Sequence, residues 1–190
     1  MEEQTRSFIA IELCSDIKEE LASLIEKLKS SGADVKWVEP LNIHLTLKFL
    51  GGMSLDEIDT IKNVMDKTKN KFKAFQMSLS QVGAFPKLSY PRVIWVGVND
   101  GKEKAKEIYD FLESELEKEF FEKEERPFSP HLTIGRVKSL KNKEALKSSI
   151  ENLKFSSAKT SLVDHVTLFK STLTPKGSIY TPIHVVKFTI

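Results

Sequence analysis

One short pattern occurs twice in this chain and restricts its possible folds more than any other feature. His-Leu-Thr-Leu at 44–47 returns as His-Leu-Thr-Ile at 131–134, 87 residues later. In both copies polar and apolar residues alternate, which is typical of a half-buried strand whose side chains point to its two faces in turn. We therefore expect the histidine and the threonine of each copy to share the polar face of a strand.

The rest of the chain alternates between strand-like and helix-like patterns. Ser54 followed by Glu57 is a capping box, and apolar residues at helical spacing follow it. The same reasoning predicts helices at 15–30, 54–65, 102–121 and 140–153, turns at 86–91 and 175–177, and strands at 7–13, 35–38, 44–50, 75–82, 92–98, 131–137, 162–171 and 183–190. Strands outnumber helices about two to one, which favours an α+β fold with antiparallel pairs over a parallel sheet.

Charge and composition exclude several classes of function. The 29 Lys and Arg residues nearly balance the 27 Asp and Glu residues, which argues against binding nucleic acid through a large basic excess. A local basic groove stays possible. The single cysteine, Cys14, excludes an internal disulfide and a multi-cysteine zinc site. No apolar run approaches the ~20 residues of a membrane span, and the acidic start lacks the features of a signal peptide. We expect a cytoplasmic protein without membrane association.

The repeated residues suggest a particular chemistry. Two imidazoles with a pKa of ~6.5 can act as a base and an acid at neutral pH, if His44 and His131 converge. The hydroxyls of Thr46 and Thr133 can donate hydrogen bonds to the oxygens of a phosphate held between them. The pattern predicts phosphoryl chemistry with no metal and no cofactor. Because the two copies are nearly symmetric, the residues alone do not assign the acid and the base.

The two motifs and their flanking segments resemble a known family. The segments that carry the resemblance are RSFIAI at 6–11, VKWVEPLNIHLTLKFLGG at 35–52, YPRVIWVGV at 90–98, FSPHLTIGRV at 128–137 and LFKSTLTPKGSIY at 168–180. Together they are similar to the RNA 2′,3′-cyclic phosphodiesterases of the LigT/ThpR type. These enzymes, also called 2′-5′ RNA ligases, are one branch of the two-histidine (2H) phosphoesterases. The resemblance extends over essentially the whole chain, in order.

This resemblance implies one bilobal α+β domain over residues 1–190. It implies antiparallel sheets flanked by helices and related by a pseudo-twofold axis, with the motifs across a central cleft. The family reaction opens RNA 2′,3′-cyclic phosphate ends to 2′-phosphates without a metal. Carried over, His44 is the proton donor, His131 is the proton acceptor, and Thr46, Thr133 and Arg136 bind the substrate phosphate. The expected partner is RNA with such an end, tRNA halves included, and we expect a monomer.

Strand geometry decides on which face two basic residues near the motifs lie. Strict alternation places Lys48 on the face of His44, where it would attract RNA or remain solvated. Strict alternation also points Arg136 away from His131, unless a bulge at Gly135 redirects it. A functional Arg136 therefore requires an irregular strand.

Other residues are weaker candidates. His165 also has a threonine two residues later, but the corresponding strand of the family does not normally carry a catalytic histidine, so a structural role is expected. His184 has no threonine partner and is also expected to be structural. Phe8, Trp37 and Tyr180 are candidates for stacking on a base, although each is more typical of a core.

Three alternative functions stay open. The same site can act on ADP-ribose cyclic phosphate or on 2′-5′ oligoadenylate. The reverse reaction would join RNA ends through a 2′-5′ bond. A non-catalytic RNA-binding module is the third possibility, but the intact histidine and threonine of both motifs favour an enzyme.

Overall fold

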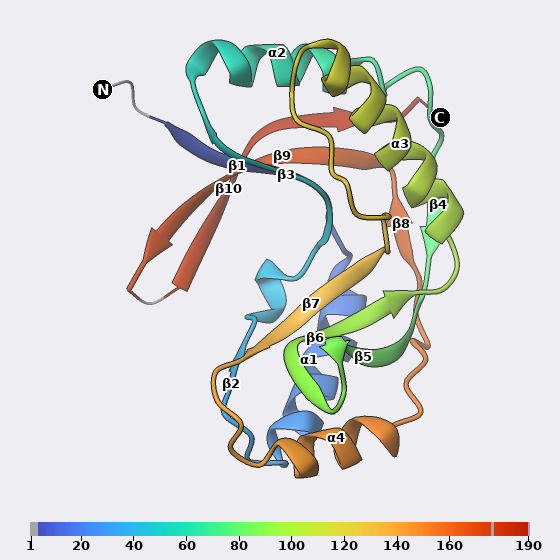
Figure 1. The fold of residues 1–190 in the computed structure, drawn as a ribbon. Helices are drawn as coiled ribbons and strands as arrows, with labels where there is room; N and C mark the ends of the chain where they lie inside the picture. Colours follow the sequence, from blue (N-terminus) through green and yellow to red (C-terminus); the bar gives the residue numbers. More distant parts are fainter. Residues whose placement is uncertain (1–3, 176, 190) are drawn as a thin grey trace.

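A computed structural model describes residues 4–175 and 177–189 (Figure 1). The helices are α1 (Ser15–Lys29), the 3-10 turn η1 (Pro40–Asn42), α2 (Leu55–Asp66), α3 (Lys102–Lys118) and α4 (Lys143–Glu151). The strands are β1 (Thr5–Ile11), β2 (Val35–Trp37), β3 (Leu45–Met53), β4 (Phe75–Met77), β5 (Leu79–Lys87), β6 (Tyr90–Val98), β7 (His131–Val137), β8 (Ser161–Val163), β9 (His165–Thr174) and β10 (Gly177–Lys187). None of the helices in these residues is both long and apolar enough to cross a membrane.

Eight strands form one antiparallel sheet that has two distinct halves. The first half has the order β10-β9-β1-β3, and the second half contains β7, β6 and β5, with β2 on the other side of β7. Strands β3 and β7 join the halves through a single residue pair, Leu45 with Leu132. Strands β4 and β8 form a separate two-stranded sheet. The strands that carry the two motifs therefore meet where the halves meet.

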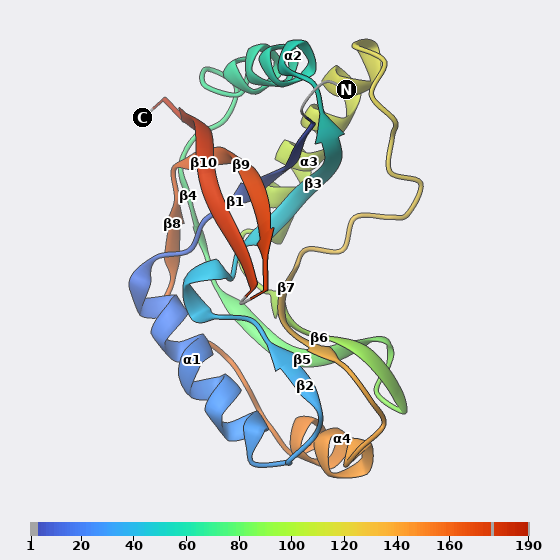
Figure 2. The same cartoon turned by 90° about the vertical axis from the view of Figure 1, so that its left-hand side faces the viewer.

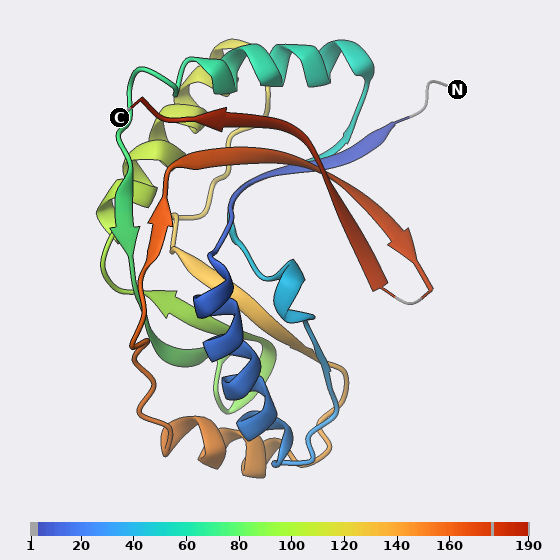
Figure 3. The ribbon, with the colours of Figure 1, turned by 180° about the vertical axis from the view of Figure 1, so that it is seen from behind.

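The two halves exchange elements. The series β1-α1-β3-α2-β4-β5 is followed by the equivalent series β6-α3-β7-α4-β8-β9. Helix α1 follows a strand of the first half but lies beside the second half, and α3 follows a strand of the second half but lies beside the first (Figures 1 and 3). Each half is therefore built from both parts of the sequence.

The helices bury one face of the sheet. Figure 2 shows α2 and α3 at one end of the molecule and α1 and α4 at the other. The apolar stripe of α1, with Leu21 and Leu28 fully buried, belongs to the same core cluster as Leu45 and Leu132. Because apolar area buried from water is the main stabilising contribution, this face is the structural one. The opposite face, where β3 meets β7, is left for function.

The structure confirms the α+β class with antiparallel pairs, and α2 carries the predicted capping box. Its backbone amide at Glu57 donates to Ser54 Oγ, and the Glu57 carboxylate accepts from the Ser54 amide at 2.7 Å. Several predicted boundaries were wrong. The strand expected at 162–171 is divided at Asp164 into β8 and β9, and the helix expected at 102–121 ends at Lys118. The strand expected at 75–82 is divided at Ser78, whose hydroxyl bonds to Asp100. The predicted turn at 86–91 lies largely in strands β5 and β6, because Pro86 and Pro91 face each other at the hairpin end, where neither needs an amide donor.

The last predicted helix, 140–153, is shorter than expected, since α4 spans Lys143–Glu151. The turn predicted at 175–177 includes Lys176, which lies outside the described residues. These differences do not involve the two motifs.

Candidate active site

The pairing of Leu45 with Leu132 gathers the motif side chains. Both leucines are fully buried, so they point to the helix-covered face of the sheet. The residues on either side of each leucine point to the opposite face, because side chains alternate along a strand. In the antiparallel register of this pair, His44 is aligned with Thr133, and Thr46 is aligned with His131. The two motifs therefore present two histidines and two threonines on one face, as the sequence predicted.

Each motif ends in a β-bulge. On β3, Thr46 pairs with Ala10 and Lys48 with Ile9, so Leu47 has no partner on β1. On β7, Thr133 pairs with Trp95 and Gly135 with Ile94, so Ile134 has no partner on β6. A bulge adds one residue to a strand and reverses the facing of the residues that follow it. The fourth residue of both motifs is the added one.

The first bulge makes the predicted position of Lys48 wrong. Lys48 points to the buried face, where it is 8% exposed and its Nζ lies 2.6 Å from the carboxylate of Glu113. Its Nζ also donates to the carbonyl of Glu122 at 2.8 Å. Phe49, which strict alternation from Leu45 and Leu47 would place on the buried face, instead pairs with Phe8 and is 72% exposed. Lys48 is thus a structural residue and not one that meets a substrate.

The second bulge turns Arg136 toward the motif face. Arg136 pairs with Val93, and Thr133 pairs with Trp95, two residues further along β6. Because residues two apart on a regular strand share a face, Arg136 and Thr133 lie on the same side. Arg136 is exposed there. The required bulge is therefore present, one residue before the position that the sequence suggested.

Both histidines are held in the same way. His44 Nδ1–H donates to the carbonyl of Asn42 at 2.8 Å, and His131 Nδ1–H donates to the carbonyl of Ser129 at 2.7 Å. A carbonyl only accepts, so this contact places the hydrogen of the neutral ring on Nδ1. No hydrogen bond from a described residue reaches either Nε2 atom. Each Nε2 is thus free to accept a proton or, once protonated, to donate one.

Aromatic rings surround His44. Its ring stacks on Phe8 at 4.7 Å between centroids, Tyr180 meets it edge-on at 5.3 Å, and Phe169 lies 6.3 Å away. This burial lowers the pKa of His44 to about 4, and the charge of Lys18 lowers it further, while the bond to Asn42 and the charge of Glu12 oppose them. His44 is therefore neutral at pH 7 in the free protein.

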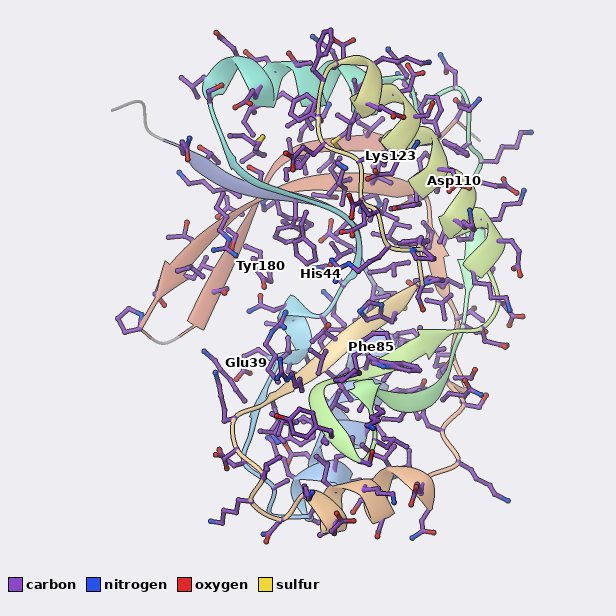
Figure 4. The ribbon with its side chains drawn as sticks, in the orientation of Figure 1. Glu39, His44, Phe85, Asp110, Lys123 and Tyr180 are labelled. Carbon is purple, nitrogen blue, oxygen red and sulfur yellow. The ribbon has the colours of Figure 1, made fainter. Side chains whose placement is uncertain are left out.

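His131 has a different neighbour. Phe85 on β5 meets its ring edge-on at 4.9 Å, and Trp95 lies 5.3 Å from Phe85. Figure 4 shows His44 and Tyr180 on one side, and Phe85 on the other side, of the region between the two halves. His44, Phe85 and Tyr180 thus come to the same region from segments that are far apart in the sequence.

The other two histidines differ from this pair because carboxylates occupy their ring nitrogens. His165 lies 2.5 Å from Asp164 through Nδ1 and 3.2 Å from Glu12 through Nε2. His184 Nε2 lies 2.7 Å from Asp66 on α2. Neither has a free Nε2, which agrees with the structural roles expected for both.

Most of the aromatic residues considered for stacking on a base already pack against other parts of the protein. Phe8 is 3% exposed and packs on His44. Trp37 lies over Gly135, on the face opposite the motifs. Tyr180 lies at the motif face, but it packs against His44. The contacts of His44 with Asn42 and Phe169 could not be predicted, since nothing in a local pattern shows which carbonyl or ring a histidine will meet.

No cluster of three or more His, Cys, Asp or Glu side chains that could hold a metal ion occurs in residues 4–175 and 177–189. The site instead consists of imidazole, hydroxyl and guanidinium groups. These groups can donate and accept protons and bind an anion.

Comparison with known proteins finds one family. A sequence model of the LigT-like phosphoesterases matches the chain twice, at residues 11–95 and 96–180. The chain is 36% identical to an RNA 2′,3′-cyclic phosphodiesterase of Methanothermobacter thermautotrophicus over 185 residues, 96% of this chain and 98% of the relative. It is 39% identical to one of Methanocaldococcus jannaschii over 175 residues, 92% of this chain and 96% of the relative.

Solved structures share the fold. TT0787 of Thermus thermophilus has a TM-score of 0.79 at 23% identity, over 96% of this chain and 97% of that one. The apo form of Escherichia coli LigT has a TM-score of 0.79 at 24% identity, over 99% of both chains. The two matches of the family model divide the chain close to the junction of the two series of elements, after β5 and before α3.

Proposed function

This chain belongs to the LigT-like phosphoesterase family, and from that membership we propose that it hydrolyses RNA 2′,3′-cyclic phosphate ends to 2′-phosphates. Its relatives over nearly the whole chain are named RNA 2′,3′-cyclic phosphodiesterases. The proposed substrate is an RNA chain, and the reaction needs neither a metal nor a cofactor.

One observation supports this assignment most directly. His44 and His131 each use Nδ1 on a backbone carbonyl two residues earlier, and each leaves Nε2 free on the face that carries both threonines. Opening a cyclic phosphodiester requires two proton transfers at one phosphorus, one from the attacking water and one to the leaving oxygen. Two matched imidazoles supply both transfers without a metal.

The proposed reaction is a single displacement at phosphorus. His131 Nε2 takes a proton from water as its oxygen bonds to phosphorus. The bond from phosphorus to the 3′ oxygen breaks, and protonated His44 gives its Nε2 proton to that oxygen. The product carries a 2′-phosphate and a 3′-hydroxyl. Thr46 and Thr133 donate hydrogen bonds to the non-bridging oxygens, and Arg136 binds a substrate phosphate.

The pKa of His44 limits when this residue can act as the proton donor. At about 4 in the free protein, it leaves His44 unprotonated at neutral pH. A bound phosphodiester adds a negative charge nearby, which favours the charged imidazole and raises its pKa. His44 thus becomes the acid only when the substrate is bound.

The test is hydrolysis of a trinucleotide with a 2′,3′-cyclic end in EDTA, followed by identification of the product isomer. We expect the 2′-phosphate from the native protein, ~10²–10⁴-fold slower formation by His44→Ala or His131→Ala, and nearly native activity from the control His184→Ala. A requirement for a divalent ion or a 3′-phosphate product would contradict the proposal. ADP-ribose cyclic phosphate and 2′-5′ oligoadenylate serve as competing substrates.

A modified substrate tests the two roles. Sulfur at the 3′ bridging position leaves as a thiolate, which needs little help from an acid because a thiol has a pKa of about 8.5. His44→Ala should regain activity on this substrate, whereas His131→Ala should not. The opposite result would exchange the acid and the base.

A further inference from the structure

A second basic residue lies beside Arg136. Strand β2 pairs with β7 so that Lys36 faces Arg136, between the pairs Val35 with Val137 and Trp37 with Gly135. A Cβ added at Gly135 would meet Val35 and Trp37, which places those two side chains on the core side. Lys36 alternates with them, so it lies on the motif face together with Arg136.

This pair of cations has no anionic partner in the described part of the chain. Lys36 and Arg136 are both exposed, and neither takes part in any of the ion pairs found there. Glu39 follows β2, but no ion pair joins it to either residue. Like charges directly opposite each other on neighbouring strands are destabilising. A bound anion would remove this repulsion, and the planar guanidinium of Arg136 suits a phosphate.

The position of the pair relates it to the reacting group. Arg136 lies three residues beyond Thr133 on the bulged strand, which corresponds to roughly 7–10 Å. Lys36 lies on β2, which pairs along the same edge of β7 as β3 but at Arg136, four residues beyond Leu132. The two cations therefore lie beyond the reacting phosphate, on the second half of the sheet and on the same face.

We propose that Lys36 and Arg136 form a subsite for the backbone phosphate that precedes the terminal nucleotide of an RNA chain. This proposal rests on the proposed function, because it takes the cyclic phosphate to lie between His44 and His131. A mononucleoside 2′,3′-cyclic phosphate has no such backbone phosphate. The subsite thus favours chains over mononucleotides without any contact with a base, since phosphate contacts position a strand and carry no sequence information.

The test compares a trinucleotide with a mononucleoside, both ending in 2′,3′-cyclic phosphate. For Lys36→Gln the ratio of kcat/KM for the trinucleotide to that for the mononucleoside should fall roughly two- to fivefold, the effect of one exposed ionic contact. The salt dependence of trinucleotide binding should lose about 0.7 of its slope. Lys36→Glu should lower the ratio further, because its carboxylate would pair with Arg136.

Lys27→Gln is the matched control, since Lys27 is an exposed lysine on α1, outside β2 and β7. It should change neither the ratio nor the salt slope. Equal losses on both substrates, or an unchanged ratio in Lys36→Gln, would overturn the subsite. A melting temperature of Lys36→Gln well below that of the native protein would also indicate a structural role.

A binding measurement separates a failure of the subsite from a failure of the proposed hydrolysis. Anisotropy of a labelled trinucleotide with a 2′-phosphate end compares the variants without turnover. If the native protein failed to hydrolyse any cyclic substrate, the proposed function would fail, yet weaker binding by Lys36→Gln alone would still support the subsite. Equal binding by the native protein, Lys36→Gln and Lys27→Gln would reject it.

Discussion

His44 and His131 occupy equivalent backbone positions in two copies of one strand, but their surroundings differ. In both copies a carbonyl two residues earlier holds Nδ1, and a bulge follows the threonine. Three aromatic rings enclose His44, whereas His131 meets the edge of Phe85. A repeated backbone can thus place two imidazoles symmetrically, while unrelated side chains give them different surroundings.

The copies also differ after the bulge. The first copy has Lys48 there, buried and paired with Glu113, and the second copy has Gly135, covered by Trp37. At the next position the first copy presents Phe49 and the second presents Arg136. At this position the first copy therefore presents an aromatic side chain and the second a basic one.

The largest expected effect is the loss of either histidine. His44→Ala and His131→Ala should each lower kcat/KM by ~10²–10⁴-fold, because each removes a separate proton transfer. His165→Ala should retain most activity, since carboxylates already occupy its ring. Steady-state kinetics on the trinucleotide measure all three. A loss in His165→Ala as large as in the other two would break the comparison, because the choice of motifs would be wrong.

The buried ion pair of the first copy should dominate stability. Lys48→Met leaves the carboxylate of Glu113 buried without its charged partner and should lower the free energy of unfolding by about 3–5 kcal/mol. Urea denaturation measures this change. The pair of Lys67 with Glu115 is the control, because Lys67 is exposed and Glu115 keeps a second partner in Lys118, so Lys67→Met should change little. Lys48→Met combined with Glu113→Leu should recover much of the loss, and failure to do so would argue for a further role of the pair.

The threonines test whether the copies act alike on phosphate. Thr46→Val and Thr133→Val each remove a proposed donor and should cost ~2.7–4 kcal/mol in the transition state, or roughly 10²–10³ in rate. Thr→Ser keeps the hydroxyl and should be much milder. If strand propensity were the only role, valine would be tolerated at least as well as serine. Activity and melting temperature of the four variants separate these cases.

The next effect in size is the pH dependence of stability that His44 contributes. Its pKa of about 4 lies below the value of 6.5 expected for the unfolded chain. Between these values the unfolded chain binds a proton that the folded protein does not, so stability falls as the pH falls through this window. His44→Gln should lose this dependence, and NMR titration should show a midpoint near 4 that rises with bound phosphate. A midpoint near 6.5 for His44 in the free protein would contradict the effect of its aromatic surroundings on its pKa.

The smallest effect concerns the glycine of the second copy. A Cβ at Gly135 would lie 2.8 Å from Val35 Cγ1 and 2.9 Å from Trp37 Cε3. Gly135→Ala should therefore lower the free energy of unfolding by about 1–3 kcal/mol through overpacking. At Gly52 a Cβ would meet only the flexible side chain of Gln4. Thermal denaturation should show that Gly52→Ala costs less, and equal losses would indicate a general cost of alanine in these strands.

We propose that residues 1–190 form one bilobal domain, on the basis of the exchanged helices. α1 and α3 each lie beside the half that does not contain the strand before them. Separating the sequence at its midpoint would leave each half without one of its helices. A single cooperative unfolding transition, seen by both tryptophan fluorescence and circular dichroism, is the expected result.

The alternation around His44 and His131 was enough to predict two polar strand faces, because side-chain direction in a strand follows from local geometry. The capping box at Ser54 could be predicted for the same reason, since it involves only Ser54 and Glu57. The face on which Lys48 and Arg136 lie could not be predicted locally, since each depends on a bulge that forms where its strand pairs with a neighbouring strand. The pKa of His44 also needed the tertiary structure. It depends on Phe169 and Tyr180, more than 100 residues away in the sequence, and burial by such distant residues is a property of the fold.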